Sequence, residues 1–191
     1  RKETFATSGP RIKIRFFSGY EFEDSDLKDL NLLETAYSNN LSMGSTINIE
    51  EGKEPRFFVW AISDPLGAPL QRVQIIKGWL EDGLHKEKVF DVACSDGLNV
   101  DPLTNRCPDN EARVNLTDCA TTNDKGDSEI KAFWKDPDFL ADQEAFYYSR
   151  VLENPVCRWS TWDAIRAGES PRSDISATIQ ERAWTSPIWF N

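Results

Sequence analysis

The sequence predicts a mainly β fold: an antiparallel β-sandwich of about six to seven strands, with one or two short helices and a long disulfide-pinned loop. Three observations support this prediction. Aromatic and β-branched residues recur in short runs that turn residues separate. Only one segment has clear helical spacing. The chain also holds 7 tryptophans and 11 phenylalanines, and large aromatic side chains bury much area per residue.

The first predicted elements are a strand and a helix. In residues 11–17 apolar and basic residues alternate, as in a half-buried strand. Residues 23–26, which combine acidic side chains with the cap residue Ser25, are typical of a helix N-terminus. The helix then follows from apolar residues at helical spacing, and a polar run ends it. The apolar residues are Leu27, Leu30, Leu33 and Tyr37, and the polar run is Ser38-Asn39-Asn40. We expect the apolar stripe of this helix to pack on a sheet.

Three strands are predicted next, at residues 56–62, 72–80 and 88–93. Turn sequences at 64–67 and at Asp82-Gly83 separate them, so we expect the three strands to form one antiparallel meander. The segment after them is different. Residues 95–128 are rich in Asp, Asn, Gly, Pro and Thr and predict a long loop, with one short strand at 112–116.

The last third of the chain returns to strands. Residues 130–134 predict a short strand or, as the alternative, a helical turn, and residues 145–153 predict a strong strand. Residues 160–168 predict a short helix that Gly168 closes. Residues 179–190 predict a closing strand, and Pro187 interrupts it as at a sheet edge or a bulge.

The four cysteines, Cys94, Cys107, Cys119 and Cys157, allow three disulfide pairings. We favour Cys94–Cys107, which would close a turn-rich loop, together with Cys119–Cys157, which would tie the long polar connection to the strand end near Pro155. The alternative is four reduced, buried thiols. An even number of cysteines in loops fits an oxidising compartment, so we expect a periplasmic or extracellular protein.

Composition argues against several function classes. The net charge is −10, whereas binding to nucleic acid or to an anionic membrane needs clustered Lys and Arg. No apolar run has the length of a membrane span, so we expect none. A zinc site, a catalytic triad and a phosphate loop also lack their sequence patterns. We therefore name no catalytic residue and expect no cofactor, with calcium as the one exception.

Calcium is considered because hard oxygen ligands on a flexible loop suit this ion. Two clusters on the long loop are candidates: Asp96, Asn99 and Asp101 in the first, and Asn123, Asp124, Asp127 and Glu129 in the second. Neither cluster follows the spacing of an EF-hand loop. The alternative interpretation is a polar surface loop without a metal.

Three further groups have a functional and a structural interpretation. Arg150 and Glu153 share a strand near Arg158 and form either part of a polar site or a surface or interface ion pair. His85, the only histidine, is either a lone acid/base or, as we expect, a solvated turn residue. Most tryptophans are expected in the core, although stacking on sugars is the alternative. The tryptophans considered are Trp60, Trp79, Trp159, Trp162, Trp184 and Trp189.

Several long blocks of the sequence resemble a known family. They are residues 75–79, 91–97, 136–139, 146–155, 157–160 and 180–189. The blocks resemble a bacterial family called domain of unknown function 3604, over nearly the whole chain. This resemblance implies an exported parent protein with an upstream PHP-type (polymerase and histidinol phosphatase) metallohydrolase domain. Such a domain holds divalent metals with His and Asp/Glu clusters.

The resemblance also implies where the metal ligands lie. Residues 1–10 resemble the passage out of the metallohydrolase domain, so the ligands are expected before Arg1. We therefore expect residues 11–191 to be a non-catalytic C-terminal β-sandwich module of an exported PHP-like metallohydrolase of unknown substrate. Its partner is then the upstream domain, which the module packs against.

Two alternatives stay open at this point. In the first, the chain is an independent module that binds glycans or self-associates through its sheets into an oligomer or filament. In the second, the chain is itself a hydrolase that uses carboxylates on the long loop.

Overall fold

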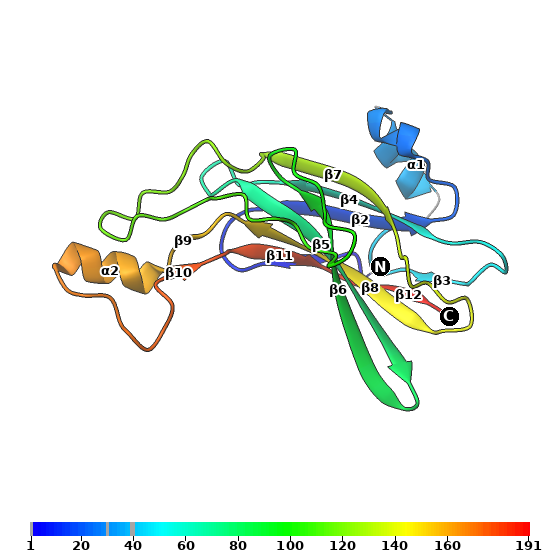
Figure 1. Ribbon diagram of the computed structural model, residues 1–191. Coiled ribbons are helices and arrows are strands. Elements are labelled where there is room, and N and C mark those ends of the chain that lie inside the picture. Colours follow the sequence, from blue (N-terminus) through cyan, green and yellow to red (C-terminus); the bar gives the residue numbers. More distant parts are fainter. Residues whose placement is uncertain (1, 30, 39–40) are drawn as a thin grey trace.

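Two β-sheets face each other in the computed structural model, which describes residues 2–29, 31–38 and 41–191 (Figure 1). The mainly β fold with antiparallel pairing is confirmed. In chain order the elements are β1 (Phe5–Thr7), β2 (Lys13–Gly19), η1 (Asp24–Lys28), α1 (Leu32–Ser38), β3 (Thr46–Ile47), β4 (Arg56–Ile62), β5 (Leu70–Glu81), β6 (Leu84–Cys94), β7 (Glu129–Lys135), β8 (Ala145–Glu153), β9 (Val156–Cys157), α2 (Trp159–Ala167), β10 (Thr178–Ile179), β11 (Arg182–Thr185) and β12 (Ile188–Phe190).

Strand β8 is the centre of the larger sheet. It pairs with β5 on one side, and β5 continues into the hairpin with β6. On its other side β8 pairs with β11 and then with β12. The predicted closing strand is therefore interior and not at an edge, because β1 and β3 lie outside it. Its interruption is as predicted, since Pro187 lacks the N–H that a continuous ladder needs.

The smaller sheet has the order β2–β4–β7. The prediction of one meander through β4, β5 and β6 is therefore wrong, because β4 pairs with β2 and β7 while β5 and β6 belong to the larger sheet. The burial of β4 gives the physical reason. Phe57, Phe58 and Val59 are all fully buried, so both faces of this strand need cover. The smaller sheet provides this cover, because Phe57 and Val59 face the larger sheet and Phe58 faces α1.

The main core lies between the two sheets. Its largest buried side chains come from both layers: Ile12, Ile14, Phe16, Phe57, Leu70, Ile75, Tyr147 and Phe190. Polar contacts with the Asp136 carboxylate cross this core. Lys77 Nζ on β5 lies 2.8 Å from Asp136 Oδ2, directly after β7, and both side chains are buried. The hydroxyl of Tyr147 donates to the same carboxylate oxygen at 2.8 Å.

Two short helices cover the far face of the smaller sheet, as Figure 1 shows. Leu32 and Ala36 of α1 pack on Phe17 and Phe58, so the predicted packing of this segment on a sheet is confirmed. The single predicted helix is wrong, since η1 and α1 are separate. The backbone of Asp29 is extended, and its carboxylate accepts a hydrogen bond from Asn31 N at 2.8 Å. The predicted contributions of Leu30, Asn39 and Asn40 lie outside the described residues.

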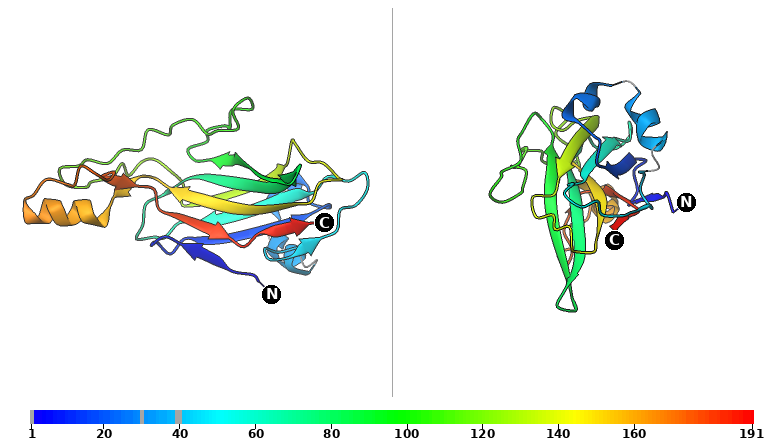
Figure 2. Two further views of the ribbon diagram at one scale, coloured as in Figure 1. Left: turned by 90° about the horizontal axis from the view of Figure 1, so that it is seen from below. Right: turned by 90° about the vertical axis from the view of Figure 1, so that its right-hand side faces the viewer.

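Two features extend away from the sandwich. The β5–β6 hairpin projects beyond the sheet, and α2 lies at one end, past the small β9–β10 ladder (Figures 1 and 2). Helix α2 ends at Gly168 with φ 71°, as predicted. In the long loop the predicted strand at 112–116 is only an isolated bridge between Val114 and Thr121. Within residues 2–29, 31–38 and 41–191, no helix is both long and apolar enough to cross a membrane.

Candidate functional site

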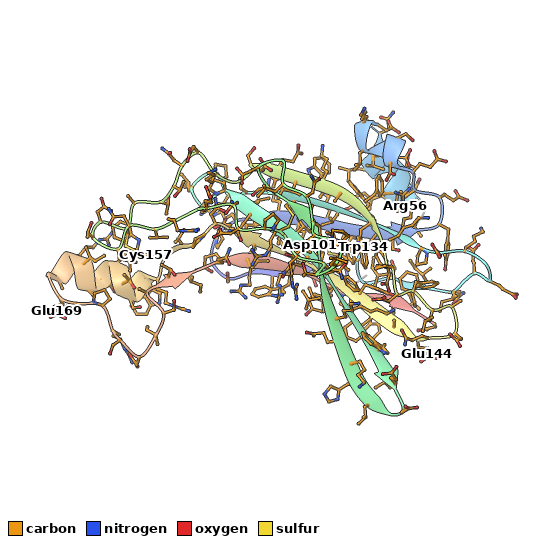
Figure 3. The ribbon with its side chains drawn as sticks, viewed as in Figure 1. Arg56, Asp101, Trp134, Glu144, Cys157 and Glu169 are labelled. Carbon is orange, nitrogen blue, oxygen red and sulfur yellow. A yellow bond between two sulfur atoms is a disulfide. The ribbon has the colours of Figure 1, made fainter. Side chains whose placement is uncertain are left out.

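Two disulfides fix the long loop against the larger sheet. Cys94–Cys107 ties the end of β6 to the loop, and Cys119–Cys157 ties the loop to the segment before α2. Both are the predicted pairs. Figure 3 shows Cys157 at the base of α2, on the side nearer the sandwich. The loop therefore has two covalent anchors at the end of the sheet from which α2 extends.

A pocket of about 610 Å³ lies at this end of the sheet. Loop residues 107–113 form one wall, residues 176–180 form another, and the start of β5 lies between them. Four arginines line it: Arg72, Arg113, Arg158 and Arg182. A second pocket of about 370 Å³ shares Arg72 and Cys107 with the first, and adds Arg106 and Arg150. Guanidinium groups therefore dominate two adjoining pockets.

Carboxylates only partly balance this charge. Asp109 lines the first pocket and pairs with Arg113, with 2.6 Å between Asp109 Oδ2 and the guanidinium. Asp91 lines the second and is buried. One of its oxygens lies 3.4 Å from Arg106, and it accepts hydrogen bonds from Gln74 Nε2 at 2.6 Å and from Cys107 N at 2.8 Å. In a chain of net charge −10, the two pockets together form a local excess of positive charge.

Two buried donors in this cluster lack a hydrogen-bond acceptor. The Nε atoms of Arg72 and Arg158 are buried, and within the described part of the chain neither makes a hydrogen bond. Arg72 Nε has an ion-pair partner, Asp91 Oδ2, but at 3.9 Å this oxygen is too far away to accept a hydrogen bond. Burial lowers the pKa of Arg72; Asp91 raises it, and the neighbouring Arg106, Arg150 and Arg182 lower it further. A buried donor without a partner costs about 1–3 kcal/mol. An oxyanion bound among these guanidiniums would supply the missing acceptors, because the guanidinium fork matches carboxylate and phosphate oxygens.

The predicted polar site is only partly assembled. Arg150 and Arg158 line the two adjoining pockets, and Arg150 Nε donates to Gln74 Oε1 at 2.7 Å. Glu153 is separate from them: its side chain is buried against Gly67, and its Oε1 has no hydrogen-bond partner among the described residues. Among those residues no ion pair joins Arg150 to Glu153.

Sequence reasoning missed the other arginines of the cluster: Arg72, Arg106, Arg113 and Arg182. One signal was present in the sequence. Arg106 directly precedes Cys107, and Arg158 directly follows Cys157. Because half-cystines anchor the loop, an arginine beside each of them is held at the junction between loop and sheet.

The calcium candidates make hydrogen bonds within the protein. The Asp96 carboxylate accepts from Gly126 N at 2.8 Å and from Asn110 Nδ2 at 3.0 Å, and Asp96 N donates to Asp127 Oδ2 at 3.2 Å. Asp101 accepts from Leu103 N, and Glu129 accepts from Trp60 Nε1 at 2.6 Å. The remaining candidates, Asn99, Asn123 and Asp124, are exposed. The described residues contain no group of three or more His, Cys, Asp or Glu placed to hold a metal ion.

A groove of about 750 Å³ lies at the base of the projecting hairpin. Aromatic side chains of Trp79, Phe146, Trp189 and Phe190 line it, together with His85. His85 is exposed near the hairpin tip, as predicted. The expectation that most tryptophans are core residues is met only in part. Trp60, Trp79 and Trp134 are half-buried and pack against the core clusters, whereas Trp159, Trp162 and Trp189 are exposed.

Comparisons with known proteins identify a family and no function. Searches of curated proteins and of solved structures find no match. One family model, described as "Protein of unknown function (DUF3604)", matches residues 1–191. The chain therefore belongs to the DUF3604 family over its whole length.

Proposed function

We propose that the chain is a non-catalytic, anion-binding β-sandwich module of an exported protein whose catalytic part is a PHP-like metallohydrolase domain. The arginine cluster carries the binding part of this proposal, since two of its buried Nε donors lack a hydrogen-bond acceptor among the described residues. The resemblance described above supports the parent protein and the upstream partner domain. The two disulfides support export to the periplasm or outside the cell, where such bonds persist.

The ligand that this cluster suits is a compact oxyanion group: a carboxylate, a phosphate or a sulfate. Arg72 and Arg158 offer buried donors, and Arg182 and Arg150 lie beside them on β11 and β8. The module would then hold an anionic group of the parent's substrate or of a matrix to which the protein attaches. No metal is required of this chain for that role.

Removing one pocket arginine tests the proposal. We expect Arg158→Gln to weaken binding of citrate, phosphate or sulfate by about tenfold, because a hydrogen bond to a charged group contributes about 1.5–3 kcal/mol. Isothermal titration calorimetry at low salt measures the affinity. The matched control is Arg166→Gln, which removes the same charge from α2 outside the pocket. Equal anion affinity in the two variants, or no anion binding by the unmodified protein, would contradict the proposal.

Self-association is a second candidate function, and the projecting hairpin favours it. Leu80 and Leu84 at the hairpin tip are 69% and 61% exposed, and β6 pairs only with β5 among the described strands. An uncovered strand edge beside apolar side chains is a surface for pairing with another chain. Light scattering on a sizing column separates the two states: an oligomer that Leu80→Lys returns to 21.8 kDa supports this role, and a monomer at every concentration argues against it.

A further inference from the structure

The outer face of the larger sheet is defined here as the face of β8 that carries Phe146, Tyr148 and Arg150. These three alternate with Tyr147, Ser149 and Val151, which are fully buried on the core side. Residues paired across strands share a face, so the registers extend the outer face in both directions. One row of paired residues crosses the strands at Phe146: Trp189, Phe146, Gly78 and Glu87. A second row crosses them at Arg150: Trp184, Arg150, Gln74 and Asp91.

One end of this face is aromatic. The rings of Phe146 and Trp189 lie 5.0 Å apart, and Trp189 is 41% exposed. The ring of Phe146 lies over Gly78, where an added Cβ would come within 2.3 Å of the ring. The glycine therefore gives the phenyl ring its place beside the tryptophan. These side chains line the 750 Å³ groove.

The other end is cationic and lies on the same face of the sheet. Trp184 is the register partner of Arg150, and the Arg182 guanidinium lies 5.9 Å from the Trp184 ring. Tyr148 lies between the two ends, because on β8 it is two residues from both Phe146 and Arg150. Phe146 and Arg150 are four residues apart on one strand, which is about 13 Å. A ligand that contacts both ends is therefore an oligomer and not a single small anion.

Carboxylates at the aromatic end narrow the ligand class. Glu87, Asp142 and Glu144 line the groove there, and Figure 3 shows Glu144 at the start of β8. These groups would repel a ligand with a negative charge on every unit, such as a nucleic acid. They would accept hydrogen bonds from sugar hydroxyls, while the aromatic rings stack on the apolar faces of sugar rings. The arginine pockets accept an anionic substituent.

We infer that the outer face binds an acidic oligosaccharide, with uncharged sugar rings against Phe146 and Trp189 and one carboxylate or sulfate group among the arginines. This inference rests on the proposed anion-binding function, since it assigns the ligand class of the same pockets. The carboxylate would come from a uronic acid and the sulfate from a sulfate ester. Both present the same chemistry to the guanidinium groups.

A glycan array that holds neutral oligosaccharides beside their uronate-bearing and sulfated counterparts tests the ligand class. We expect binding to acidic members only, and the array shows which of the two acidic groups is accepted. Binding of the neutral members at equal strength would overturn the inference, and so would binding of no acidic glycan.

Calorimetry with the best-bound glycan then tests the two ends separately. Trp189→Ala should weaken glycan binding about tenfold and leave citrate or sulfate binding unchanged, while Trp159→Ala on α2 is the matched control. Arg158→Gln should weaken both kinds of ligand. If Trp189→Ala binds the glycan like the unmodified protein, the extended face is refuted and the anion pocket stands. If free anions do not bind either, the proposed function fails as well.

Discussion

Replacing Lys77 with methionine should lower the free energy of unfolding by about 4 kcal/mol, the range for breaking one partner of a buried ion pair. Lys77 Nζ lies 2.8 Å from Asp136 Oδ2 and donates to Asp138 O at 2.8 Å. Without the ammonium group the Asp136 carboxylate stays buried, and among the described residues its remaining hydrogen bonds come from Tyr147 and from Asp138 N. Burial and this carboxylate both raise the pKa of Tyr147, so the phenol stays a neutral donor.

A second variant separates the lost charge from lost packing. Lys77→Met combined with Asp136→Asn removes both charges, and we expect it to recover most of the lost stability, because neutral replacements of a buried pair are often tolerated. Urea denaturation followed by tryptophan fluorescence measures all three proteins. A double variant no more stable than Lys77→Met would show that packing of the lysine chain, and not the buried charge, controls stability here.

Glu153 should make the protein less stable as the pH rises from about 5 to 8. Burial raises the pKa of this carboxyl from 4.5 to about 7, and the nearby Asp64 and Glu181 add to the shift, while the backbone N–H of Ala68 opposes it. The folded state therefore holds a proton that the unfolded state releases at lower pH. The stabilisation is complete below pH 4.5, declines as the pH rises through 7, and its loss amounts to about 3 kcal/mol.

The comparison that isolates this effect is Glu153→Gln, which is neutral at every pH. The free energy of unfolding of this variant, relative to the unmodified protein, should increase by about 3 kcal/mol between pH 4.5 and pH 8. Glu169→Gln, at an exposed position past α2, is the control and should show no such increase. A difference between Glu153→Gln and the unmodified protein that does not vary with pH would contradict the prediction.

Local patterns predicted the local structure well. The strand at 145–153, the helix that Gly168 closes and both disulfide pairs were found where predicted. The strand and the helix depend on residues that are neighbours in the sequence, and the disulfides depend on a choice among three pairings. The assignment of β4 to the meander failed because turn residues show that the chain reverses, and not into which sheet it returns. The single helix failed because Asp29 breaks it through a side-chain hydrogen bond that periodicity cannot show.

The candidate site was harder to predict because it combines distant parts of the chain. Arg72, Arg113 and Arg158 come from β5, the long loop and the segment before α2, and nothing in their spacing relates them. A net charge of −10 also hides a local excess of the opposite sign. Tryptophan content indicated a large core, whereas Trp159 and Trp162 are exposed on α2 and Trp189 is exposed on β12.

The pairing of β1 with β11 has a consequence for how the chain folds. Phe5 pairs with Thr185, and the side chains of Thr4 and Ser186 are hydrogen-bonded to each other. Strand β8 likewise completes its ladder only with residues 182–190. Contacts between such distant positions give a high contact order, and folding slows as contact order rises. During synthesis β8 therefore keeps an unpaired edge until the last strands emerge, and folding is a late event that needs both ends of the domain at once.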